Sequence, residues 1–126
     1  MDLNLILWIL QVVLAAVFIG AGFTHATQRD HPRPRMEWMQ AVPPGALTTI
    51  AVLEILGGIG LVLPAATRIL PILTPIAAAA LALLMLFAAI FHIRRPNELP
   101  NVLFNAVLGL LALFVAYGRF VLEPIS

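Results

Sequence analysis

The sequence contains no cysteine and no lysine, and only 10% of its 126 residues are charged. Without cysteine the chain has no disulfide, thiol relay, cysteine-ligated iron–sulfur cluster or C-x-x-C redox site, so a redox role needs a borrowed cofactor. Its seven basic residues are arginines scattered along the chain, and the formal net charge is +1. Because nucleic-acid binding needs a concentrated basic surface, we expect no nucleic-acid partner.

Apolar residues take the place of the missing charge. They make up 62% of the chain, and the mean hydropathy is +1.04. Water-soluble domains are about half apolar and about one quarter charged. The composition therefore predicts that the chain lies in a lipid bilayer.

Four apolar runs divide the chain, at about residues 3–25, 46–63, 73–93 and 102–122. Each is close to the length that crosses a hydrocarbon core of about 30 Å. Because lipid offers no hydrogen-bonding partner to the backbone, a spanning segment must be a helix or part of a closed barrel. The alternation of apolar and polar residues that is typical of barrel strands is missing, so we predict helices. We expect Pro64 to end the second run. The expected fold is all-α, an integral membrane four-helix bundle forming a single domain over residues 1–126.

The first run resembles a signal peptide only in its position. It lacks a positively charged beginning, and its apolar stretch is too long for the hydrophobic region of a signal peptide. We therefore expect a retained first span.

The arginines predict the orientation. The first and third connections carry five of the seven, namely Arg29, Arg33, Arg35, Arg94 and Arg95. Arg68 and Arg119 belong to the other side, and Arg119 is close enough to the end of its span to snorkel to the interface. The positive-inside rule then predicts a cell-membrane protein with the first and third connections in the cytoplasm and both termini outside.

The first connection, residues 26–45, is the only long one. Its segment 35–42 fits a short interfacial helix and, equally well, an ordered loop anchored by Trp38. His31 lies among arginines and prolines, which favours a solvated basic segment over a metal site. We expect no metal site, and no nucleophile-elbow, phosphate-loop or zinc motif is present.

Small residues recur at four-residue spacing, which lets helices approach closely in lipid. The pairs are Ala16/Gly20, Ala78/Ala82 and Ala112/Ala116, and Gly57, Gly58 and Gly60 lie in the second span. We favour a tight intramolecular bundle over a dimerisation face, and a homo-oligomer is the alternative.

Glu54 is the most informative residue, because an acid inside a membrane span is rare and costly. It lies about eight residues into the second span, roughly 12 Å deep, and should face the bundle interior. Its candidate partners are Gln11, Asn105, His25 and His92. Their depths allow a polar track from the cytoplasmic surface past Asn105 to Glu54. Such a site would serve as a proton relay, a ligand anchor or a small-molecule pocket; the alternative is a structural hydrogen-bond hub with Glu54 protonated.

His25 and His92 lie on different spans, which is the minimal arrangement for haem in a four-helix bundle. Both lie at span ends, His92 beside arginines. Because this is the usual setting of an interfacial histidine, we favour that interpretation over haem.

Several segments together resemble the DoxX-like family of small four-helix membrane proteins. They are residues 7–11 with Ala21 and Gly22, residues 52–57 and 60–64, residues 73–75 and 91–95, and Asn105 with residues 115–120. The resemblance also implies a lysine at the end of the first span, where this chain has His25.

The resemblance implies a redox-associated membrane subunit, since the family takes its name from a subunit of thiosulfate:quinone oxidoreduction. The first hypothesis is that this subunit contacts a quinone near Glu54 and the histidines, with electrons supplied by a membrane or peripheral redox protein because the chain has no cysteine. Two other classes remain open: a small-molecule binding or transport module, and a scaffold or assembly factor without a ligand.

Overall fold

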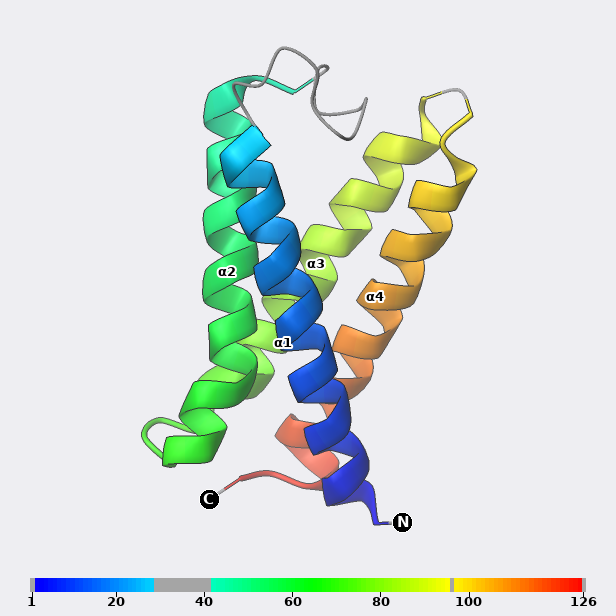
Figure 1. The fold of residues 1–126 in the computed structure, drawn as a ribbon. Helices are drawn as coiled ribbons and strands as arrows, with labels where there is room; N and C mark the ends of the chain where they lie inside the picture. Colours follow the sequence, from blue (N-terminus) through cyan, green and yellow to red (C-terminus); the bar gives the residue numbers. More distant parts are fainter. Residues whose placement is uncertain (1, 29–41, 96, 126) are drawn as a thin grey trace.

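The computed structural model describes residues 2–28, 42–95 and 97–125, and this part of the chain is helical with short connections (Figure 1). The elements are α1 (Leu3–Gln28), α2 (Pro44–Thr67), α3 (Leu73–Ile93), α4 (Leu99–Tyr117) and a terminal π-helical turn η2 (Gly118–Leu122). Within these residues, four helices are long and apolar enough to cross a membrane. The expected all-α membrane bundle is confirmed. Residues 35–41 and His31, for which the sequence made predictions, lie outside the described residues.

The prediction that Pro64 ends the second span was wrong, because α2 continues to Thr67. Proline has no N–H, so the carbonyl of Gly60 one turn earlier loses its usual helical donor. The buried hydroxyl of Thr74 on α3 donates to that carbonyl over 3.0 Å. A side chain of a neighbouring helix thus satisfies the freed backbone group, which is how proline is tolerated inside a membrane helix. Arg68, the C-cap residue directly after the helix, adopts the left-handed conformation with φ of 59°.

The four helices form two pairs. α1 packs along α2, α3 packs along α4, and contacts between α2 and α3 join the pairs. Figure 1 shows α1 and α4 close together near the chain termini and apart near the connections after α1 and α3. We call the first the closed end and the second the open end.

Glycines bring α1 and α2 into backbone contact. A Cβ atom added to Gly22 would lie 2.6 Å from Cγ1 of Ile55 and 2.9 Å from the carbonyl oxygen of Ala51. A Cβ atom on Gly58 would lie 2.7 Å from Cγ1 of Ile19. This close seam is what lets a side chain one turn further along α1 reach across to α2.

The small-residue pairs divide between the inside and the outside of the bundle. Ala78, Ala112 and Ala116 are buried in the core, as a tight intramolecular bundle requires. Ala16 and Gly20 are exposed, and a Cβ atom on Gly20 would have no neighbour within 4 Å. The first pair therefore does not serve the packing of the described helices.

Large apolar side chains cover the outer surface of the helices as well as the core. Examples on the outside are Leu56, Leu110 and Val121, each at least 60% exposed. Such a surface is stable in lipid and unfavourable in water. The chain is therefore a multi-pass membrane protein.

Candidate functional site

A cavity of about 650 Å³ lies at the open end and is lined by residues from all four helices. Its wall is mainly apolar and includes Phe18, Met85, Phe91, Phe104 and Leu108. Its polar lining consists of His25, Glu54, His92, Asn101 and Asn105. The volume falls within the range of about 300–1,000 Å³ that is usual for small-molecule sites.

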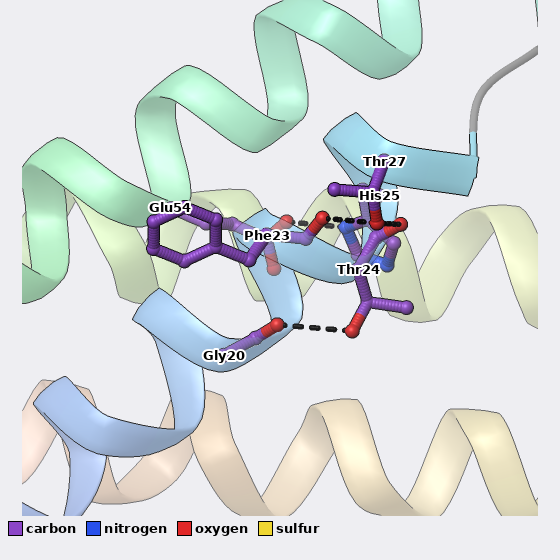
Figure 2. A network of polar contacts seen from close by, with 6 residues as sticks. All are labelled: Gly20, Phe23, Thr24, His25, Thr27 and Glu54. Carbon is purple, nitrogen blue, oxygen red and sulfur yellow. Dashed lines mark hydrogen bonds and ion pairs between the residues drawn. The ribbon is translucent and has the colours of Figure 1, made fainter.

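His25 and Glu54 form a buried pair across the seam of α1 and α2. The distance from His25 Nδ1 to Glu54 Oε1 is 2.5 Å, and the two residues are 6% and 3% exposed. Figure 2 shows that the nearby hydroxyls of Thr24 and Thr27 are bonded to carbonyls of α1 itself. The acid's observed partner is thus His25, one of the four that the sequence allowed. A carboxyl and an imidazole at this distance can share and exchange a proton.

His92 belongs to a second acid–base group at the rim of the cavity. Its Nδ1 lies 2.5 Å from Oε1 of Glu98, while Nε of Arg95 donates to Oε2 of Glu98 over 2.5 Å. The hydrogen bond with His92, together with Arg95, lowers the pKa of the Glu98 carboxyl, which lies outside the spans. Asn97 makes the turn that returns Glu98 to His92, with φ of 63°.

Two amides of α4 face the same cavity. Asn105 lies one turn deeper than Asn101, and both line the cavity with partly buried side chains. Within the described part of the chain, neither side-chain amide has a hydrogen-bonding partner. These groups can therefore donate to or accept from a polar ligand in the cavity.

Gln11 lies apart from the other four candidates, in a network at the closed end. Its Nε2 donates to the carbonyl of Leu61 over 2.7 Å, and its Oε1 accepts from Nε of Arg119 over 2.7 Å. Arg119 is only 3% exposed, so it does not snorkel although it lies close to the end of its span. The η2 turn directs its guanidinium inward, where it also meets Asn4.

The structure brings Glu54, His25, His92 and Asn105 to one cavity, as the proposed polar track required, but not Gln11. Sequence reasoning missed Asn101 and Glu98. Asn101 carries a weak signal, since it precedes Asn105 by one helical turn. Glu98 carries none, because its pairing with His92 depends on the path of a short turn.

The two histidines considered for haem each hold a carboxylate through Nδ1. Among the described residues, no group of three or more His, Asp or Glu side chains could hold a metal ion. Both imidazoles thus lie at a distance that allows proton exchange with a carboxyl group.

The chain was compared with family models, curated proteins and solved structures. No curated protein and no solved structure matches the chain. The model of the DoxX-like family matches residues 9–115, which include the cavity residues from α1 to α4. The chain therefore belongs to the DoxX-like family.

Proposed function

We propose that the protein is a redox-associated membrane subunit that binds a quinone-class molecule in the cavity at the open end. The observation that carries this proposal is the buried His25–Glu54 pair in the wall of an otherwise apolar cavity of about 650 Å³. A ligand with a polar head and an apolar body suits such a lining.

The chemistry of the lining fits a quinone head. Its two carbonyl oxygens accept hydrogen bonds, and the cavity offers the imidazole of His25 and the amides of Asn101 and Asn105 as donors. Phe91 and Phe104 supply flat apolar surface for a ring. An isoprenoid tail would continue along the apolar outer face of the helices.

Reduction of a quinone to a quinol consumes two electrons and two protons. In this proposal His25 and Glu54 hold one exchangeable proton between Nδ1 and Oε1, at a distance that permits its transfer. His92 and Glu98 form a second such pair at the rim, closer to the aqueous side. Because the chain has no cysteine, we propose that a membrane or peripheral partner protein supplies the electrons.

We also propose that the open end faces the cytoplasm of a cell membrane, so that both termini lie outside. The positive-inside rule supports this, since five of seven arginines belong to the connections at that end. The absence of cysteine makes the test simple. In intact cells an impermeant maleimide should label Ile69→Cys and spare Ala26→Cys, and the reverse pattern would overturn the orientation.

Quinone retention tests the binding proposal directly. Protein purified from quinone-containing membranes in a mild detergent is extracted with organic solvent, and quinone is measured by liquid chromatography. We expect bound quinone in the wild type and its loss in Glu54→Gln. Ala88→Phe should also remove it by filling the cavity, whereas Ala80→Phe on the exposed face of α3 should not.

A wild-type protein that is free of quinone would contradict the proposal. Retention of a different apolar molecule that is lost in Glu54→Gln and in Ala88→Phe would favour the small-molecule binding or transport class. An empty cavity in a protein that still co-purifies with a stable partner would favour the scaffold class.

A further inference from the structure

The closed end contains a buried positive charge whose hydrogen-bond acceptors are all neutral, and the exposed Glu123 carboxylate attracts it only through space. Arg119 is 3% exposed, and its guanidinium donates to Gln11 Oε1 over 2.7 Å, to Asn4 Oδ1 over 2.9 Å and to the Glu123 carbonyl over 2.9 Å. The fourth contact, to the Asn4 carbonyl, is long at 3.5 Å. These acceptors are all neutral. Among the described residues Arg119 forms no ion pair, and the Glu123 side chain is exposed.

Neutral acceptors satisfy the hydrogen bonds of a guanidinium but not its charge. Buried charges in proteins are normally paired, because the loss of hydration is otherwise uncompensated. The ring of Trp8, whose centroid is 5.7 Å from Arg119 Cζ, gives only a weak cation–π contribution. The exposed Glu123 carboxylate offsets part of this loss through space, and a negative group in contact with the guanidinium would offset more of it.

Space for such a group exists beside Arg119. A cavity of about 230 Å³ is lined by Arg119, Thr74 and Phe120 together with apolar and proline residues of the α2–α3 connection and of the C-terminal segment. Its described lining contains no acidic side chain. The first turn of α3 borders it, and the helix dipole adds partial positive charge there.

We propose that this second cavity binds an anion of the phosphate class, held by the guanidinium of Arg119. Its source is either the phosphate of an anionic lipid headgroup or a free phosphate-like anion. Both sources suit the charge of the guanidinium, and Nη2, whose one contact is the long one to the Asn4 carbonyl, can donate to a phosphate oxygen. The site lies at the opposite end of the bundle from the cavity of the proposed function and does not depend on it.

The lipid source is tested with native mass spectrometry on protein released from nanodiscs of phosphatidylcholine containing phosphatidylglycerol. We expect a retained phosphatidylglycerol adduct in the wild type, and a fall of about tenfold or more in Arg119→Gln, because a hydrogen bond to a charged group shifts an equilibrium by that order. Arg68→Gln removes the same charge from an exposed position at the same end and should leave the adduct unchanged.

The free anion is tested in a neutral detergent without added lipid. If it is the source, inorganic phosphate should raise the melting temperature of the wild type above that in sodium chloride of equal ionic strength, and should not do so in Arg119→Gln. A phosphatidylglycerol adduct without this response assigns the site to lipid. If neither the adduct nor the phosphate response is observed, the proposal is overturned, and Arg119 has only a structural role.

A second variant keeps the test decisive if Arg119→Gln does not fold. Ile125→Glu leaves Arg119 in place and brings a carboxylate to the lining of the cavity. It should displace the anion, abolishing the adduct or the phosphate response, while the protein melts at the same or a higher temperature. Anion binding that is unchanged in Ile125→Glu would contradict the assignment to this cavity.

Discussion

The two ends of the bundle use polar residues in opposite ways. At the closed end, Arg119 and Gln11 connect η2, α1 and the backbone of α2 through short hydrogen bonds. At the open end, His25 pairs with Glu54 and His92 with Glu98, yet the helices between them enclose about 650 Å³. The polar groups of the closed end span the packed helices, whereas those of the open end surround a space.

This difference indicates a division of labour within a small membrane protein. A bundle that is fastened at one end can leave the other end open without losing its fold. Substitutions at the closed end should therefore change stability, and substitutions at the open end should change binding. The following tests can separate the two roles or show that they are mixed.

The largest effect is expected from Arg119→Ala. It removes the donor for Gln11, Asn4 and the Glu123 carbonyl, and hydrogen bonds from a charged group contribute about 1.5–3 kcal/mol each. We expect the free energy of unfolding, measured by denaturant titration in mixed micelles, to fall by about 3 kcal/mol or more. Arg68→Ala, at an exposed position, is the control and should change it little. Equal effects of the two would remove the special role of the closed end.

The seam between α1 and α2 gives the next effect. Gly22→Ala places a Cβ atom 2.9 Å from the Ala51 carbonyl, so the helices must separate, at a cost of about 1–3 kcal/mol. Gly20→Ala on the same helix meets no atom within 4 Å and should be neutral or stabilising by up to about 1 kcal/mol. Thermal unfolding of both variants checks this. Because the seam positions His25 against Glu54, Gly22→Ala should also reduce quinone retention. Normal retention would show that close packing of the seam is not needed for quinone binding.

Gln11→Leu and Glu54→Gln compare the two ends directly. Gln11→Leu leaves the Leu61 carbonyl and Arg119 Nε without their buried partner, and should destabilise by about 1–2 kcal/mol without changing quinone retention. Glu54→Gln preserves shape and one hydrogen bond to His25, and should remove retention with a smaller loss of stability. Both quantities are measured on each variant. If Gln11→Leu also abolished retention, the two ends would be coupled.

Acid should weaken the contact of Glu98 with His92 and Arg95, which is the smallest expected effect. Since the folded-state pKa of Glu98 is lowered, the contact stabilises fully above the unfolded pKa of about 4.3 and is lost as the pH falls through the folded pKa. The melting-temperature difference between the wild type and Glu98→Gln should therefore shrink below about pH 4. Glu123→Gln, at an exposed position, should show no such trend.

The architecture could be predicted from the sequence because lipid imposes strict rules. Apolar length predicts a span, and an unpaired backbone forces that span to be a helix. These rules do not predict which backbone groups near a helix end receive hydrogen bonds from a neighbouring helix. Pro64 stops a helix in isolation, but Thr74 removes the reason for stopping. The exact span ends therefore depended on contacts between helices.

The candidate site was predictable in its members but not in its pairing. An acid within a membrane span should face the bundle interior, and this limited the partners of Glu54 to a few polar residues. Four of the five candidate residues share one cavity. Depth alone could not choose among Gln11, Asn105, His25 and His92, since rotation of each helix decides which side chains meet. For the same reason the position of Arg119 near the end of its span did not reveal that the π-helical turn directs it inward.

The hydrogen bond from Thr74 to the Gly60 carbonyl constrains the order in which mutations can be accepted. While Pro64 is present, loss of the Thr74 hydroxyl leaves a buried carbonyl without a donor. If Pro64 is first replaced by a residue with an N–H, the helix satisfies that carbonyl itself and Thr74 becomes replaceable. Two positions ten residues apart are thus epistatic, and the path of substitutions that keeps every intermediate stable begins at the proline.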